Sequence, residues 1–467
     1  MVSPSRSGIA GRLATSLTTI LCDSMLKRFP LVVRHINYNL RGGFLVRPLI
    51  IAMILGFAGA ILSTTEAAVP VLATWVPRWL FPSRSDPQVA QIILGAIAGS
   101  VMTVVSIVFA ILLMTLTLAS MQFSPRIIVS FAKDRTTQWT LGFFVGTFTY
   151  CIAALPAAHT YPHRAEPVIT VMGAMLLAVL CVALLLFFIH HISQAISVNY
   201  IVDNIASDTE QAILEMMPKS SASPRFVVPE PPIVNGDEAP IHSEESGYIR
   251  YMDLQRLKVV AKQNQVSVEV TRRVGHFVPM GAVLLNVSKQ NKLTPELRIQ
   301  LLAAFDIGPS RTLEQDVEYG ILQIVDIALK AISPAANDPT TAITCVDQLC
   351  RILIFFASRE PFEWRLYDPP GYLRVAAPQL GLERLVDYAF EQIRVYAKGD
   401  AAVSLRLLRA LRDLGAAIPE PALQRVLAER GNRIMAGVAE RLGEEELTEL
   451  RIRNEALQVA ATSANFV

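Results

Sequence analysis

A polar stretch between residues 311 and 347 holds side chains that are suited to binding a ligand. Arg311 precedes an expected helix from about Leu313 to Ile332, and the loop from Ser333 to Thr341 ends this helix and begins another. Helix N-termini attract anions, but Asp338 at the start of the second helix would repel one. A cation or a neutral ligand is therefore the expected occupant. The candidate soluble polar site consists of Arg311, Asp326, Asn337, Asp338 and Thr340.

Local helix chemistry offers a second interpretation of the same loop. Asp338 is expected to accept hydrogen bonds from free amides in the first turn of the next helix, where Pro339 is also favoured. Such a cap needs no ligand, so the sequence leaves both interpretations open.

A second group of candidates follows one face of a long apolar segment, Val89 to Met121. Small and hydroxyl residues recur there every three or four positions, beginning with Gly95 and Gly99. Inside lipid, such residues usually mark where helices touch. The other interpretation is a hydroxyl-lined permeation path at the axis of an oligomer. The candidate pore or helix-packing face consists of Thr103, Ser106, Ala110, Thr117, Ser120 and Ser124.

The end of this segment is marked by a helix-start signal. Ser124 is a suitable N-cap and Pro125 a suitable first residue for a new, interfacial helix that carries Lys133 and Arg135. This turn could join the membrane part to the soluble part, and its candidate coupling residues are Gln122, Pro125 and Arg126.

Patterns typical of catalysis or metal binding are missing from the sequence. It contains no Walker loop, no GxGxxG after a strand, no HExxH and no GxSxG. His159 and His163 are four residues apart, but Pro162 lies between them and no third ligand follows. We therefore expect no metal and no cofactor, and the sequence does not favour an enzyme.

Composition divides the chain into a membrane part and a soluble part. Of its 467 residues 52% are hydrophobic, and the formal net charge is +2. Residues 1–199 carry a charge of about +8 and residues 200–467 about −6, by count over the sequence. The acidic soluble part argues against nucleic-acid binding. Four segments are long and apolar enough to span a bilayer, at about 48–65, 89–121, 139–158 and 168–189.

Basic residues predict how these spans are oriented. Lys and Arg are more numerous before the first span and between the second and third spans than in the loops between the first and second and between the third and fourth spans. Because loops rich in Lys and Arg stay in the cytoplasm, both termini are expected there. The span interiors contain no Lys, Arg, Asp or Glu, which argues against an ion-coupled pump. Glu66, His190 and His191 lie at span ends, where we interpret them as interfacial anchors.

The expected fold is mainly α-helical, with a four-span membrane domain and a mostly helical soluble domain. The expected divisions are a basic amphipathic segment at 1–47, the membrane domain at 48–199, a juxtamembrane helix and linker at 200–247, a strand-bearing module at 248–292 and a helical cytoplasmic domain at 293–467. Within the module, Gly275 to Leu284 resembles the hairpin of barrel-sandwich proteins such as lipoyl domains, without their acceptor lysine.

Two stretches carry a family resemblance. Leu116 to Arg126 and Asp326 to Ala342 resemble the signature regions of a bacterial membrane-protein family known as domain of unknown function 2254. The resemblance implies an inner-membrane protein with an N-terminal membrane domain and a soluble C-terminal domain. It implies no reaction, substrate or catalytic residue.

Two functions are compatible with these patterns. The first is a channel or uncoupled transporter, a homo-oligomer in the bilayer that is regulated by its cytoplasmic domain. The second is a membrane-anchored sensor or scaffold that binds a ligand or a protein through the soluble domain.

Overall fold

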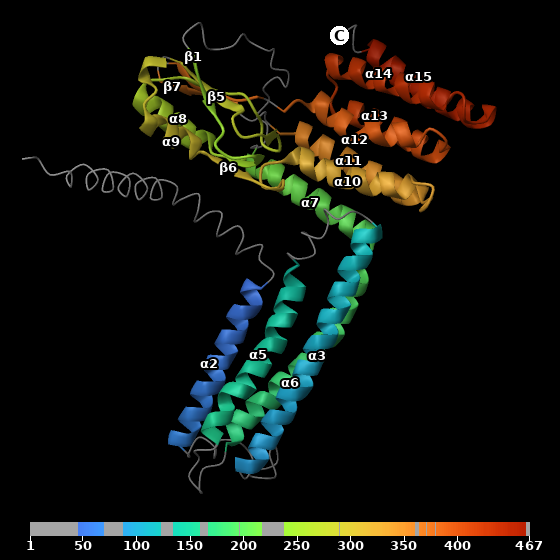
Figure 1. The fold of residues 1–467 in the computed structure, drawn as a ribbon. Helices are drawn as coiled ribbons and strands as arrows, with labels where there is room; N and C mark the ends of the chain where they lie inside the picture. Colours follow the sequence, from blue (N-terminus) through green and yellow to red (C-terminus); the bar gives the residue numbers. More distant parts are fainter. Residues whose placement is uncertain are drawn as a thin grey trace, which may run out of the picture. The chain divides into compact units, whose positions relative to one another are not determined.

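The protein folds into two compact units, residues 36–200 and residues 201–467. A computed structural model describes residues 45–69, 87–122, 134–158, 167–195, 197–216, 238–288, 290–359, 364–369, 371–378 and 380–463. Figure 1 shows the elements of both units. The basic N-terminal segment and the expected turn at Ser124, Pro125 and Arg126 lie outside the described residues.

The first unit contains four long apolar helices at the positions that the hydropathy pattern predicts. They are α2 (Val46–Ala68), α3 (Pro87–Gln122), α5 (Arg135–Ala158) and α6 (Val168–Ala195). Helix α5 packs against the other three, most extensively against α2. Each of the four is long and apolar enough to cross a bilayer.

Small residues let α2 and α5 approach closely. A Cβ atom on Gly59 would lie 2.6 Å from the carbonyl oxygen of Tyr150, and one on Gly142 would lie 2.6 Å from Ile51 Cδ1. Two hydroxyl groups cross the same interface, since Ser63 donates to the carbonyl of Ala154 and Thr149 donates to that of Ala52. The glycine pattern on these two helices therefore serves helix packing.

We predict that Gly59→Ala destabilises the first unit by about 1–3 kcal/mol, the usual cost of overpacking. The obstructing atoms belong to the α5 backbone, which cannot move aside cheaply. Gly99→Ala on α3 is the matched control, because a Cβ atom there meets nothing within 4 Å. Unfolding of the two variants in mixed detergent micelles measures the stability of each. Equal stability of the two variants would contradict the prediction.

Side-chain hydrogen bonds connect both ends of helix α6 to neighbouring helices. At its start, the buried Glu66 carboxylate accepts hydrogen bonds from the Ile169 and Thr170 amides at 2.7 and 2.9 Å. Near its other end, His191 Nε2 lies 2.9 Å from Oδ2 of Asp134, which also accepts from the Thr137 amide in the first turn of α5. Both acids therefore link helices.

The second unit begins with helix α7 (Val198–Met216) and continues with two sheets and two helices that lie beside them. One sheet has the order β1 (Glu238–His242), β5 (Val283–Ser288), β3 (Val268–Val270), β8 (Tyr372–Ala376) and β7 (Arg365–Asp368). The other sheet has the order β4 (Phe277–Val278), β2 (Gly247–Met252) and β6 (Phe305–Gly308). Helices α8 (Leu254–Asn264) and α9 (Pro295–Leu302) share an apolar core with these strands.

The hairpin predicted over Gly275 to Leu284 is wrong. Its two strands, β4 and β5, do not pair with each other: β4 pairs with β2, whereas β5 pairs with β1 and β3. Strands β6, β7 and β8 complete the two sheets from residues expected to belong to the helical domain at 293–467. Local sequence patterns do not predict this pairing, because β8 pairs with β3, a strand about a hundred residues earlier.

The rest of the second unit is a helical bundle. Its helices are α10 (Val317–Ile332), α11 (Pro339–Ala357), α12 (Leu382–Tyr396), α13 (Ala401–Ala417), α14 (Pro421–Val438) and α15 (Glu444–Ser463). The helix expected from about Leu313 begins later, at Val317, because Asp316 caps α10 through the Tyr319 amide.

A fifth helix, α11, is also long and apolar enough to cross a membrane. It contacts α10, α12 and α13 in the bundle. Its Arg351 pairs with Glu210 and Asp203 of α7, at 2.7 Å each, and its Asp347 pairs with Arg406 of α13.

Candidate functional site

The candidate face on α3 points away from the other helices of its unit. Thr103, Ser106, Ala110 and Thr117 are all exposed in the single chain. Each hydroxyl donates to a carbonyl of its own helix four residues earlier, at 2.8 to 3.0 Å. Gly95 and Gly99 on the same face also meet nothing within 4 Å. The side chains of Ser120 and Gln122 lie outside the described residues, as does Ser124.

The outward faces of α2 and α6 carry mainly large apolar side chains, whereas that of α3 combines small residues with exposed large ones such as Ile92, Leu113 and Met114. On α2 the exposed side chains include Ile54, Phe57 and Ile61, and on α6 they include Leu176 and Leu186, each at least 60% exposed. Large apolar side chains suit contact with lipid, whereas small residues suit contact with another helix. The α3 stripe is therefore the part of this outer surface that is best suited to contact another protein surface.

In the soluble unit, the Asn337–Asp338 loop forms a helix cap on the surface. Asp338 accepts hydrogen bonds from the Thr341 amide at 3.1 Å and from the Thr341 hydroxyl at 2.6 Å. Asn337 adopts a left-handed conformation with φ of 46°. Asn337, Asp338 and Thr340 are exposed. This geometry matches the cap interpretation of the sequence.

The five residues of the candidate soluble site do not converge. Arg311 binds Asp316 at the start of α10, whereas Asn337, Asp338 and Thr340 follow its end. The 16 residues of α10 span about 24 Å at 1.5 Å per residue. Asp326 lies midway along this helix.

We predict that Asp338→Ala costs about 1 kcal/mol of stability, as is usual for loss of an N-cap. The Thr341 side chain and amide lower the pKa of Asp338 below its ordinary 3.8 by hydrogen bonding. The cap therefore stabilises fully above that value and is lost as the pH falls through the lowered pKa. Denaturant unfolding of the original protein and of Asp338→Ala measures the difference in their free energies of unfolding. This difference should be smaller at pH 3 than at pH 7.

The soluble unit instead contains a buried ion cluster outside the five candidate residues, apart from Arg311. Glu318 Oε1 lies 2.9 Å from Arg273 Nη2 and 3.3 Å from Arg384 Nε. Arg311 donates to both carboxylate oxygens of Asp316, at 2.7 Å each. The side chains of Arg273, Asp316 and Glu318 are each less than 10% exposed. These charges bring together the β3–β4 loop, the segment after β6, and helices α10 and α12.

Gly275 allows this close approach. It has a φ of +86°, and a Cβ atom there would lie 2.3 Å from Oδ2 of Asp316. The neighbouring His276 contacts Arg273, with 3.3 Å between its Nε2 and Arg273 Nη2. Burial, followed by the charges of Arg273 and Arg384, lowers the pKa of His276 from 6.5. This imidazole is therefore neutral at pH 7.

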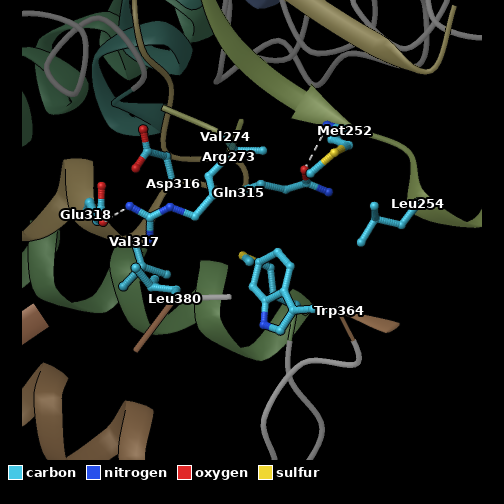
Figure 2. Close-up of a pocket in the computed structure, with 11 residues that line it drawn as sticks. Met252, Leu254, Arg273, Val274, Gln315, Asp316, Val317, Glu318, Trp364 and Leu380 are labelled. Carbon is cyan, nitrogen blue, oxygen red and sulfur yellow. Dashed lines mark hydrogen bonds and ion pairs between the residues drawn. The ribbon is translucent and has the colours of Figure 1, made fainter. Parts of the chain in front are cut away.

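A cavity of about 40 Å³ adjoins the cluster. Figure 2 shows Arg273 reaching toward Glu318 on one side, while Trp364 and Leu254 lie on the other. Gln315 uses its carbonyl oxygen to accept from the Met252 amide at 2.9 Å. The cavity thus has a charged end and an apolar wall, lined by Met216, Met252, Leu254, Val274, Val317, Trp364 and Leu380.

Only a weak sequence signal indicated this cluster. Adjacent Arg272 and Arg273, and two acids spaced by one residue at 316 and 318, resemble ordinary surface charges. Their pairing joins residues 45 positions apart, which local spacing does not reveal. Within the described part of the chain, no three His, Cys, Asp or Glu side chains are close enough to share a metal ion.

Comparison with known proteins identifies the family. Residues 41–413 match the family described as predicted membrane protein (DUF2254), and the chain belongs to this family. It is 30% identical over 405 residues to the uncharacterized proteins Mb1321c of Mycobacterium bovis and Rv1290c of Mycobacterium tuberculosis. The alignment covers 84% of this chain and 75% of each relative. No solved structure matches the chain.

Proposed function

We propose that this DUF2254 protein associates with copies of itself through the outward face of α3, and that the assembled α3 helices line a path for small solutes or ions. The soluble unit would regulate this path from the cytoplasm. One observation carries the proposal: the small and hydroxyl residues of the candidate face, from Gly95 to Thr117, have no partner helix within the described part of their own unit, whereas those of α2 and α5 pack together.

The geometry of the stripe supports association. At about 100° per residue, Gly95, Gly99, Thr103, Ser106, Ala110 and Thr117 fall within about 80° of the helix circumference. Larger exposed side chains flank them, Met102 and Phe109 on one side and Ile107 and Met114 on the other. Exposed Ile92 and Leu113 also fall on this arc, so the small residues form an uninterrupted strip only from Gly95 to Ala110, where a second helix could approach closely.

The proposal includes four spans, α2, α3, α5 and α6, in the bacterial inner membrane with both termini in the cytoplasm. Helix α11 would remain in the soluble unit. This placement of α11 is supported by the ion pairs that Asp347 and Arg351 form with other helices of that unit. Charged groups are costly in lipid, so these pairs favour a position outside the bilayer. Reporter fusions after residues 80, 162 and 467 test this topology. An exported C-terminal reporter would contradict it.

Self-association is tested by cysteine cross-linking of the full chain in membranes. Ser106→Cys should give a disulfide-linked dimer on oxidation, because equivalent stripes would face each other. Thr64→Cys is the matched control, since Thr64 is also outward-facing and bonded to its own helix. Equal cross-linking of both variants would reject the α3 interface.

Flux through purified protein in liposomes tests the path itself. We expect flux of small solutes or ions that falls at least tenfold in Thr103→Leu and Thr117→Leu, since leucine blocks a narrow hydroxyl-lined path. Thr64→Leu should retain the original flux. The absence of flux across a broad panel of solutes would refute the path, even if cross-linking supported an oligomer.

The alternative function is a membrane-anchored sensor or scaffold. A different observation supports it, namely the cavity beside the ion cluster of the soluble unit. A protein that binds a ligand there but conducts no solute would favour this alternative.

A further inference from the structure

A groove of about 290 Å³ lies between α13 and α15 on the surface of the helical bundle. Residues 418–420 alone join α13 to α14, and so short a connection makes the two helices antiparallel. Helices α14 and α15 are also antiparallel, because Gln458 bonds to Ala428 whereas Asn454 bonds to Asn432. Helices α13 and α15 are therefore parallel. The groove is lined by Leu408, Arg409, Arg412, Glu449, Ile452, Arg453 and Ala456.

The α13 wall of this groove carries more positive than negative charge. Arg409 and Arg412 lie 3.6 and 3.1 Å from the same carboxylate, that of Asp413. On the α15 wall the charges are balanced, since Arg453 lies 2.8 Å from Glu449. Two arginines that share one aspartate can accept one more carboxylate.

The first turn of α15 carries the opposite excess. Its three glutamates, Glu444, Glu445 and Glu446, are exposed. Arg451 pairs with Glu444 at 3.2 Å, but Glu445 has no ion-pair partner among the residues that the structure describes. The helix dipole contributes about half an elementary charge at this end, which is too little to balance three carboxylates.

An exposed apolar side chain lies between these two charged regions. Ile452 forms part of the groove and is 62% exposed, and Ala456, one turn later, is exposed as well. The centre of a protein–protein interface is usually apolar and its rim polar. The groove and the first turn of α15 together have this arrangement.

A second copy of the chain would match both charged regions at once. Two α15 helices related by two-fold symmetry would cross in antiparallel directions near Ile452. Glu445 lies about 10 Å before Ile452 at 1.5 Å per residue, so the partner's Glu445 would lie about 10 Å beyond it. Because α13 and α15 are parallel, Arg412 lies toward that end of the groove, beside Ala456. Symmetry repeats the contact on the other copy.

We propose that two copies of this chain pair through the groove between α13 and α15, with Glu445 of each copy bound to Arg412 of the other. An acidic partner of another kind would match Arg412 but leave Glu445 without a cation. A second copy supplies both charges, and it covers Ile452 at the centre of the contact. This pairing does not depend on the α3 face or on a permeation path.

Cross-linking of the purified full chain in detergent micelles tests the contact. Ile452→Cys should give a linked dimer with a short bismaleimide, because the two Ile452 positions would lie close to the symmetry axis. Val259→Cys, at a 53% exposed position on α8, is the control and should give no more linked dimer than the unsubstituted chain. A yield from Ile452→Cys no higher than that of the control would overturn the proposal.

Charge reversal in the Ile452→Cys chain tests the predicted ion pair. Arg412→Glu and Glu445→Arg should each lower the yield of linked dimer at least fivefold, and the two together should restore it. Arg433→Glu on α14, which removes an exposed arginine from its pair with Glu429, should leave the yield unchanged. Unaltered yields in the single reversals, or no recovery in the combined one, would overturn the assignment. The unfolding temperature of each variant shows that it is folded.

Discussion

Replacement of Glu318 by glutamine is expected to destabilise the soluble unit by about 3–5 kcal/mol, the usual cost of removing one partner from a buried ion pair. The glutamine would leave Arg273, which is 8% exposed, without its carboxylate. Arg384 contributes less, because it is 51% exposed and water can solvate it. Hydrogen exchange of the α10 and α12 amides in the full chain measures the loss.

A matched change on the surface serves as the control for this prediction. Glu383→Gln removes a carboxylate that is 54% exposed and lies 3.6 Å from Arg430. We expect a change of less than about 1 kcal/mol there, because exposed ion pairs contribute little. If Glu318→Gln behaved like Glu383→Gln, the cluster would not hold the sheets to the helical bundle.

Replacement of Glu66 by alanine is expected to destabilise the first unit by about 2–4 kcal/mol. Glu66 is 1% exposed, and it accepts bonds from the Ile169 amide, the Thr170 amide and the Thr170 hydroxyl. Donors that are buried without an acceptor keep their full desolvation cost. Unfolding in mixed micelles, followed by circular dichroism, measures the change.

Thr65→Ala is the control for Glu66. Thr65 lies one residue away, is exposed, and donates only to carbonyls of its own helix, at 2.8 and 3.0 Å. Its loss should change stability little, and Glu66→Gln should fall between the two because it keeps one acceptor oxygen. An unchanged stability of Glu66→Ala would mean that the start of α6 does not depend on this link.

Helices that depend only on residues close together in the sequence were predictable from it. Apolar runs of about 20 residues placed α2, α3, α5 and α6, since hydropathy along one segment is enough to indicate a membrane helix. The capping residue Asp338 likewise predicted where α11 begins. The prediction was less accurate at α10, which was expected from about Leu313 but begins at Val317, after its cap Asp316.

The sequence by itself therefore determined the four long apolar helices of the first unit and the cap that begins α11, which depend on neighbouring residues. Tertiary structure alone decided which small-residue face stays outward and which strands pair. It also decided that Arg273 meets Glu318, 45 positions later, beside a cavity. These outcomes depend on contacts between distant segments, and a charged or small residue looks the same in the sequence whether its partner is water, lipid or another helix.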